Sequence, residues 1–484
     1  MTNQTKKIIA GIICASVLMG LSVSWAAKPN MILIMTDDLG YGDLSCYPAL
    51  YDVQTPNIDR LAESGVRMTQ AYSGGPVCSP TRASLLTGKF PQRAGVYGNY
   101  DGATPGVGPF RDTFPPLLQQ AGYRTAWFGK WHQGWDVSNH PLNNGFDVAF
   151  GYLGGMHDYF DSEKGDHYIG GPFATHSFVL NGFKPVREMD YFTTELNNRA
   201  MQFVRETKDQ PFFIYLAHSA PHTPIQAPDE AILKYLKPGG DPIAATRRAM
   251  IDVLDQSIGE LMETLKQEGV LENTLVVFTS DNGAENQLYN GGMRGTKMTA
   301  WEGATHVPLI ASWPSSLPTG ETSSAICSTP DLTATFLALA EAETKSLDLD
   351  GVNLMPFWTG RQSGNAHDGL VWAVGAHGGA GTLPTPDNMD LLAVRLGDWK
   401  LSRDKKREID ALYNVKDDPG EQNDVSEHYP EKRAELMAYS AEFLKTCPPS
   451  CGPIANFNTR ANGDRLMEDA LRKRCNELIE KTTR

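Results

Sequence analysis

The 484-residue chain is predicted to fold as an α/β protein with a large, mostly parallel sheet flanked by helices and a smaller C-terminal α+β subdomain. Short apolar runs alternate with segments of helical periodicity, which is typical of such a sheet. A polar, glycine-rich stretch at 358–368 marks a boundary between an N-terminal domain at 27–365 and a C-terminal subdomain at 366–484 with an antiparallel sheet and a helix. With 41% hydrophobic and 9% aromatic residues, the chain is neither disordered, collagen-like nor a coiled coil.

The apolar runs and the helical periodicities place the expected elements along the chain. Apolar runs bounded by polar or turn residues predict strands at 30–36, 123–129, 212–217, 274–279 and 307–311. Apolar residues at helical spacing predict helices at 192–204 and 250–265, and proline in a first turn supports one at 56–64. Beyond the boundary, a strand-like stretch at 391–402 precedes a helix from Pro430 to about Lys445.

Residues 1–26 have the pattern of a secretory signal peptide. Two lysines precede an apolar run from Ile8 to Val23, and Ser24 and Ala26 fit the small-x-small cleavage pattern. An uncleaved anchor is the alternative, but this run is short for a membrane span and no later run is long enough. We therefore expect an exported protein, periplasmic or secreted, with no stable membrane anchor.

The chain is acidic, and six of its seven cysteines lie beyond the signal peptide. A net charge of −14 makes it a poor binder of nucleic acid, so no nucleic-acid partner is expected. Export permits disulfides. Cys447 and Cys451 flank a Pro-Pro-Ser turn and could form a bridge, and Cys475 is another possible partner. The sequence leaves the connectivity open among Cys46, Cys327, Cys447, Cys451 and Cys475.

Polar residues follow two of the predicted strands. Asp37 and Asp38 come directly after the run at 30–36, and Asp281 and Asn282 come after the run at 274–279. The carboxyl ends of parallel strands meet at one edge of a sheet, where ligands bind. These oxygen ligands suit Ca²⁺ or Mg²⁺ better than Zn²⁺, which prefers histidine or cysteine. Taken alone, Asp37-Asp38 is typical of a helix cap or a solvated turn, but together with the second strand end and the cysteine motif below it indicates a site for a hard divalent cation.

A cysteine motif then points to a family. Cys78-Ser79-Pro80-Thr81-Arg82 fits the pattern Cys-x-Pro-x-Arg and is followed by Thr87-Gly88. Further matching segments are Gly129–His132, Ala220–Pro224, Asp281–Gly283, Lys297 with Trp301–Gly303, Gly397–Leu401 and Asp418-Pro419. With these segments, the chain resembles the formylglycine-dependent sulfatases of the alkaline phosphatase superfamily, in particular exported bacterial glycan sulfatases and arylsulfatases.

The resemblance implies a modified nucleophile at Cys78. A separate formylglycine-generating maturation enzyme would oxidise Cys78 to formylglycine (3-oxoalanine), whose aldehyde hydrates to a geminal diol. One diol oxygen would attack sulfur and the other would expel the sulfate, which is covalent catalysis with a release step. The cation, Ca²⁺ or Mg²⁺, would be bound by the strand-end residues Asp37, Asp38, Asp281 and Asn282 together with residue 78.

The resemblance also implies the anion-binding residues. Lys130 and Lys297 would bind the sulfate group, and Arg82 would brace the diol or the metal-binding carboxylates. The surroundings of Lys297 depart from the family pattern, since Thr296 replaces the usual glycine, Ala304 replaces the second glycine and His306 replaces a frequent arginine. Asp43 is nearby in sequence and is expected to be structural.

Two histidines fit proton transfer, because imidazole titrates near neutral pH. By resemblance, His132 would take the diol proton and His222 would assist the departing alcohol, with His218 as a rival for the second role. His157 and Asp158, in a segment resembling the substrate-side loop of the family, and Arg294 are candidates for substrate binding. Weaker candidates are His167, His176, Trp301 and His377.

The expected function is a sulfatase, a sulfuric ester hydrolase that acts on sulfate monoesters of a sulfated carbohydrate. The substrate would be an algal galactan such as carrageenan, or a glycosaminoglycan. One alternative is a formylglycine-type hydrolase of phosphate or phosphonate esters, and another is an inactive secreted glycan-binding homologue. A metal-dependent phosphatase with a Ser or Thr nucleophile would leave the cysteine motif unexplained.

Overall fold

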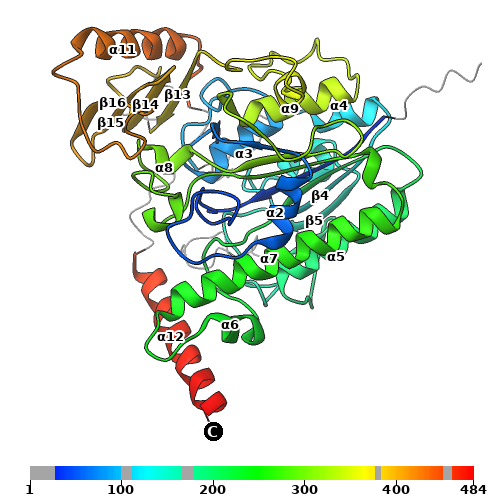
Figure 1. Ribbon diagram of the computed structural model, residues 1–484. Helices are drawn as coiled ribbons and strands as arrows, with labels where there is room; N and C mark the ends of the chain where they lie inside the picture. The colour runs from blue at the N-terminus through cyan, green and yellow to red at the C-terminus, as the bar shows by residue number, and fades with distance from the viewer. Residues whose placement is uncertain (1–27, 100–111, 166–177, 376–382, 451–460, 484) are drawn as a thin grey trace, which may run out of the picture.

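The computed structural model describes residues 28–99, 112–165, 178–375, 383–450 and 461–483. Within these residues, a ten-stranded sheet forms the centre of the large domain (Figure 1). Its strand order is β11-β2-β10-β9-β1-β8-β4-β5-β6-β7. The strands are β1 (Asn30–Thr36), β2 (Val66–Met68), β4 (Arg124–Lys130), β5 (Val148–Tyr152), β6 (Leu180–Asn181), β7 (Lys184–Pro185), β8 (Phe212–Ala217), β9 (Thr274–Ser280), β10 (Leu309–Ser312) and β11 (Glu321–Ser323). The predicted signal peptide, His167, His176, His377 and Cys451 lie outside the described residues.

The central strands β1, β8 and β9 are buried along their whole length. They pair in parallel, as do β4 with β8 and β4 with β5, whereas β10 runs antiparallel to β9. Strands covered on both faces have no solvent side, so their sequences read as continuous apolar runs. The prediction of a mostly parallel α/β sheet is therefore confirmed.

Helices cover both faces of this sheet (Figure 1). Alternate residues of β1 point to opposite faces. Ile32 and Ile34 pack in the apolar core with α5 (Phe192–Thr207) and α7 (Pro242–Gln267), and Met31 and Leu33 pack in the core with α3 (Cys78–Thr87) and α9 (Thr329–Leu339). The other described helices here are α2 (Pro56–Glu63), α4 (Pro115–Gln120), α6 (Asp229–Tyr235), α8 (Glu302–Thr305) and α10 (Met355–Trp358), with 3₁₀ turns at Val137–Asn139, Pro141–Asn144, Leu271–Asn273 and Gln287–Asn290. A small sheet joins β3 (Ala71–Tyr72) to β12 (Cys327–Ser328).

The C-terminal unit is a four-stranded antiparallel sheet. It contains β13 (Gly369–Val374), β14 (Leu391–Leu396), β15 (Trp399–Asp404) and β16 (Ile409–Asn414), and α11 (Pro430–Lys445) covers one face with Leu436 and Leu444. The stretch at 391–402, predicted to be strand-like, forms the strands and turn of a hairpin. Its two-residue turn has Gly397 at φ +57°. Glycine adopts this left-handed conformation without steric cost, which allows the tight reversal.

The last described helix, α12 (Ala461–Thr483), packs on the large domain. Its residues Leu471, Cys475 and Leu478 repeat at helical spacing and belong to the same apolar core as α7. Figure 1 shows α12 beside the end of α7 that lies near α6. Cys447 instead lies in the core of the C-terminal sheet, so Cys447 and Cys475 are separate free thiols. No helix within the described ranges is long and apolar enough to cross a membrane.

Candidate active site

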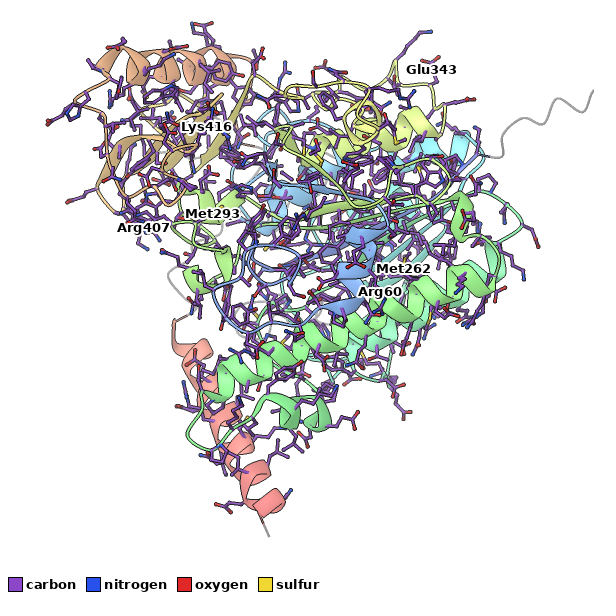
Figure 2. The ribbon with its side chains drawn as sticks, in the orientation of Figure 1. Arg60, Met262, Met293, Glu343, Arg407 and Lys416 are labelled. Carbon is purple, nitrogen blue, oxygen red and sulfur yellow. The ribbon has the colours of Figure 1, made fainter. Side chains whose placement is uncertain are left out.

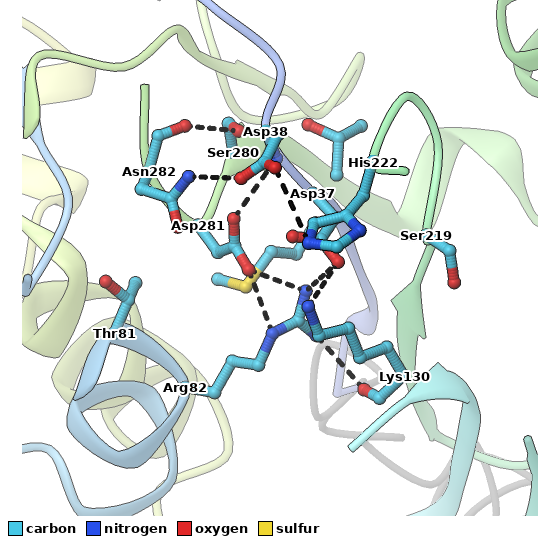
Figure 3. A network of polar contacts seen from close by, with 12 residues as sticks. Asp37, Asp38, Thr81, Arg82, Lys130, Ser219, His222, Ser280, Asp281 and Asn282 are labelled. Carbon is cyan, nitrogen blue, oxygen red and sulfur yellow. Dashed lines mark hydrogen bonds and ion pairs between the residues drawn. The ribbon is translucent and has the colours of Figure 1, made fainter. Parts of the chain in front are cut away.

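The two predicted pairs of oxygen ligands meet at one edge of the sheet. Because β1 and β9 are parallel neighbours with Thr36 opposite Ser280, the residues that follow them lie side by side. The Asp281 backbone N–H donates to the Thr36 carbonyl at 3.0 Å, and the Asn282 amide donates to Asp38 at 2.6 Å (Figure 3). All four side chains are buried. Asp38 has φ +61°, a strained conformation that is often retained where function requires it.

Each of the three carboxylates is paired with a different cation. Lys130, at the end of β4, lies 2.5 Å from Asp37 (Nζ to Oδ2), and Arg82 of α3 contacts Asp281 through Nη2 at 2.8 Å and Nε at 3.0 Å. Lys297 Nζ lies 2.7 Å from Asp38 Oδ1. Charges removed from water need such partners, since an unpaired buried ion costs several kcal/mol.

The charges divide the carboxyl groups into two kinds. Burial would raise the pKa of Asp37, but Lys130 and His222 outweigh it and lower the pKa to about 2. Burial likewise opposes the ionisation of Asp38, and Lys297 overcomes it, so that the pKa lies well below the usual range. For Asp281, burial and the neighbouring Asp37 prevail and raise the pKa to about 7. Asp37 and Asp38 are therefore ionised at neutral pH, whereas Asp281 has a pKa close to neutrality.

The oxygen atoms of this cluster fit a divalent cation. Asp37 Oδ1 and Asn282 Oδ1 are buried and accept no hydrogen bond from the described residues. Potential ligand atoms of Asp37, Asp38, Cys78 and His222 all lie within 4.8 Å of one another. Buried acceptors without donors are costly, and a hard cation that takes oxygen ligands would satisfy them.

The cysteine motif forms the first turn of α3. Cys78 is the first helical residue and is buried, and Arg82 lies one turn further along the same face. Pro80 is tolerated between them because the first N–H groups of a helix have no intrahelical acceptor. Burial raises the pKa of the Cys78 thiol, although Lys130 and Lys297 act in the opposite direction. The unmodified thiol is therefore a poor source of thiolate.

Of the histidines, His222 faces the carboxylates. Its Nε2 lies 3.6 Å from Asp38 Oδ2, and its Nδ1 donates to the Thr223 carbonyl at 2.6 Å. Burial lowers the pKa of His222 to about 4, so the free site holds a neutral imidazole whose Nε2 is the accepting nitrogen. Burial lowers the pKa of His218 to about 3, and neither of its ring nitrogens has a hydrogen-bond partner among the described residues.

His132 follows β4 with φ +55°. Its backbone N–H donates to the Leu153 carbonyl at 3.2 Å, and its ring lies against Gly155, where a Cβ would fall 2.9 Å from the ring Nε2. Lys130 thus lies in the carboxylate cluster, whereas the His132 ring lies against the loop that follows β5.

A cavity of about 650 Å³ opens onto Asp38. Two predicted substrate residues, His157 and Asp158, line it. The third, Arg294, turns elsewhere: its guanidinium lies 4.3 Å from the Trp301 ring and donates to the Glu421 carbonyl at 2.7 Å. The geometry therefore gives Arg294 a structural contact rather than a place on the cavity wall.

Other cavity residues were not anticipated from the sequence. Arg247 of α7 pairs with Asp43 through two 2.6 Å contacts and donates to the Asp38 carbonyl at 3.2 Å. One wall comes from α12, through Leu471, Arg472 and Arg474. The apolar spacing of α12 could have predicted a helix, but no local signal indicates that it reaches the cavity.

Comparisons with known proteins identify the family of this chain. The sequence model of the sulfatase family matches residues 29–342. N-acetylgalactosamine-6-sulfatase of Homo sapiens is 34% identical over 365 residues, covering 70% of this chain and 67% of that protein. The uncharacterized sulfatase YdeN of Escherichia coli (strain K12) is 32% identical over 393 residues, with coverages of 72% and 69%. The crystal structure of Ps i-CgsB in complex with k-i-k-neocarrahexaose superposes with a TM-score of 0.79 at 31% identity, covering 91% of this chain and 97% of that one. The chain thus belongs to the sulfatase family and is a sulfuric ester hydrolase.

Proposed function

We propose that this enzyme hydrolyses sulfate monoesters of a sulfated carbohydrate, with a formylglycine at position 78 and one divalent cation. The observation that carries the proposal is the buried cluster in which Lys130 and Lys297 pair with Asp37 and Asp38, the last of which lines a cavity. A sulfate ester is an anion that repels nucleophiles, and fixed positive groups in a dry site are the most effective means of stabilising its transition state.

The surroundings of Cys78 suit a formylglycine better than an unmodified thiol. A thiol whose pKa is raised by burial is a weak nucleophile, and sulfur is a poor ligand for the cation that the neighbouring oxygens favour. A hydrated aldehyde at the same place would supply two oxygens, one to attack sulfur and one to release sulfate. A maturation enzyme of the host is therefore part of the proposal.

The cation would be held by Asp37, Asp38, Asp281 and Asn282 together with residue 78, and we propose Ca²⁺, with Mg²⁺ as the alternative. When bound, such an ion supplies Lewis acidity and neutralises negative charge. Arg82 keeps the Asp281 carboxylate in place through two contacts to one oxygen. The other oxygen of that carboxylate, Oδ1, accepts from the Asp38 backbone N–H at 3.4 Å and would offer its second lone pair to the ion.

Proton transfer falls to two histidines in this proposal. His222 presents Nε2 to the cluster while Nδ1 is held by the Thr223 carbonyl, which fixes the orientation of the ring. A bound sulfate ester adds negative charge next to this imidazole and favours its protonated form, which can then donate to the departing alcohol. His132 would accept the proton of the diol during release of sulfate.

The cavity supports a carbohydrate substrate. Its volume of about 650 Å³ lies within the usual range for ligand sites, and its lining mixes His157, Tyr289 and charged side chains of both signs. Relatives point to the same class, one named for N-acetylgalactosamine 6-sulfate and one solved with a neocarrahexaose. We therefore propose an algal galactan such as carrageenan, or a glycosaminoglycan, as the substrate, met outside the cytoplasm after export directed by residues 1–26.

The proposal is tested with protein matured in its own host and supplied with Ca²⁺. Sulfate release is measured from sulfated galactan and glycosaminoglycan oligosaccharides, and hydrolysis of aryl sulfate is compared with that of aryl phosphate and a phosphonate monoester. Faster hydrolysis of the sulfated compounds is the expected result. Faster hydrolysis of the phosphorus esters would favour the alternative ester hydrolase, and glycan binding without any hydrolysis would favour an inactive homologue.

A further inference from the structure

The segment that carries Lys297 lies between the large domain and the C-terminal sheet. The Lys297 backbone N–H donates to the Ala284 carbonyl at 3.0 Å, and the Met298 N–H donates to the Pro76 carbonyl at 2.9 Å. Met298 has φ +63°, a conformation that a non-glycine residue keeps only when its surroundings hold it. The position of the Lys297 ammonium group therefore depends on what fixes the ends of this segment.

Glu421, in the turn after β16, holds both ends. Its carboxylate Oε2 accepts a hydrogen bond from the backbone N–H of Glu302 at 2.6 Å. Its backbone carbonyl accepts one from Arg294 Nη1 at 2.7 Å. Glu421 is fully buried and has φ +48°, so its own backbone is also strained. One residue of the C-terminal unit thus binds the segment on either side of Lys297.

A buried charge network surrounds Glu421. Lys400 of β15 lies 3.0 Å from Glu302 Oε1 and 3.2 Å from Glu421 Oε1, and all three side chains are buried. Glu302 also accepts from the Tyr72 hydroxyl at 2.8 Å. Replacing a buried charge network with apolar side chains is often neutral for stability. The network around Glu421 is therefore better explained by its directed contacts, which fix one geometry of the segment.

Further contacts from the same sheet reach the middle of the segment. Ser402 Oγ donates to the Ala300 carbonyl at 3.0 Å. Arg407, labelled in Figure 2 on the C-terminal unit, donates to the Met298 carbonyl at 3.3 Å. On the other side, Gly283 fits against the segment so closely that a Cβ there would fall 1.8 Å from the Gly303 carbonyl oxygen. The segment therefore lies in contact with the C-terminal sheet on one side and with the residues that follow β9 on the other.

We propose that Glu421 is a positioning residue for Lys297, through which the C-terminal sheet sets the ammonium group against the sulfate without touching the substrate. This inference rests on the proposed function, in which Lys297 binds the sulfate. A displacement of about 1 Å of a catalytic group can cost on the order of 100-fold in rate, so contacts that hold a flexible lysine matter for catalysis.

The experiment compares Glu421→Ala with Leu412→Ala in the matured enzyme on a small aryl sulfate. Leu412 is fully buried in the C-terminal sheet and contributes to its apolar core, so it controls for loss of stability. Glu421→Ala is expected to lower kcat/KM between about 10-fold and 100-fold, whereas Leu412→Ala leaves it within about 2-fold. Equal kinetics for the two variants would overturn the proposal.

A double substitution separates positioning from a general effect on the fold. If Glu421 acts through Lys297, Glu421→Ala has little further effect in the Lys297→Ala background, because the group it positions is gone. Multiplying losses would overturn the proposal. Should Glu421→Ala fail to fold, Ser402→Ala is measured in its place against the same control.

The conservative variant provides a further readout. Glu421→Gln keeps a side-chain oxygen that can accept from the Glu302 N–H, so it is expected to recover most of the kcat/KM that Glu421→Ala loses. No recovery would contradict the role given to this hydrogen bond. Failure of the proposed function would look different, because wild-type enzyme would then hydrolyse no sulfate ester, whereas failure of the positioning role leaves wild type active and Glu421→Ala equally active.

Discussion

Arg82 is the residue whose loss the structure allows us to evaluate most directly. Arg82→Met keeps much of the buried side-chain volume and removes the guanidinium, which contacts Asp281 at 2.8 and 3.0 Å and the Lys130 carbonyl at 3.0 Å. Breaking a fully buried ion pair costs about 3 to 5 kcal/mol, whereas the Lys130 carbonyl keeps a 3.4 Å hydrogen bond from the Trp127 indole N–H. Asp281 offsets part of this cost, because its pKa is already raised to about 7 and it can take up a proton.

We therefore expect Arg82→Met to lower the free energy of unfolding by about 3 to 5 kcal/mol. The assay is urea unfolding followed by tryptophan fluorescence, at neutral pH and without added divalent cation. The control is Arg433→Met, since Arg433 pairs with Asp410 at 2.7 Å on the exposed surface, where such pairs are worth about 0 to 1 kcal/mol. A loss for Arg82→Met no larger than that of the control would refute the reasoning.

Three further predictions concern the cation, the cavity and pH. Ca²⁺ at 100 times its Kd is expected to stabilise the enzyme by about 2.7 kcal/mol, and Asn282→Ala is expected to reduce this gain. An unchanged midpoint of thermal unfolding for wild type on adding Ca²⁺ would contradict the cation site. Arg472 lines the cavity, so Arg472→Ala is expected to raise KM on the order of tenfold for a sulfated oligosaccharide but not for a small aryl sulfate. Lys473→Ala, on the exposed face of α12, is the control, and equal changes in KM for both substrates would contradict this prediction. Burial would lower the pKa of His367, but the 2.7 Å contact with Asp331 raises it above 6.5. The stability it contributes is complete below pH 6.5 and is lost as pH rises through the folded pKa, so urea unfolding should show a steeper loss above pH 6.5 for wild type than for His367→Asn, and parallel curves would exclude it.

The parts of the fold that the sequence predicts well are those with a strong local signal. The strands β1, β8 and β9 are buried on both faces and read as unbroken apolar runs, and the strand-end acids follow from their parallel pairing. Helix α3 gives no such signal, because all ten of its residues are buried and no polar face alternates with an apolar one.

Contacts across long sequence separations could not be predicted. Glu421 and Glu302 lie 119 residues apart, and nothing local to either residue indicates that the backbone of one meets the carboxylate of the other. For the same reason, nothing in the sequence indicates that Arg294, a candidate for substrate binding, donates to the Glu421 carbonyl. Of the predicted site, the structure brings together the strand-end ligands, Cys78, Arg82, both lysines and His222, whereas the roles given to these residues stay predictions.

The most direct test of the proposed chemistry is peptide mass spectrometry of the segment that contains Cys78, from enzyme purified from its own host with measurable sulfatase activity. Conversion of the thiol to the aldehyde lowers the peptide mass by about 18 Da, and we predict this loss in a fraction that scales with activity. An unmodified thiol at Cys78 in fully active enzyme would contradict the formylglycine mechanism.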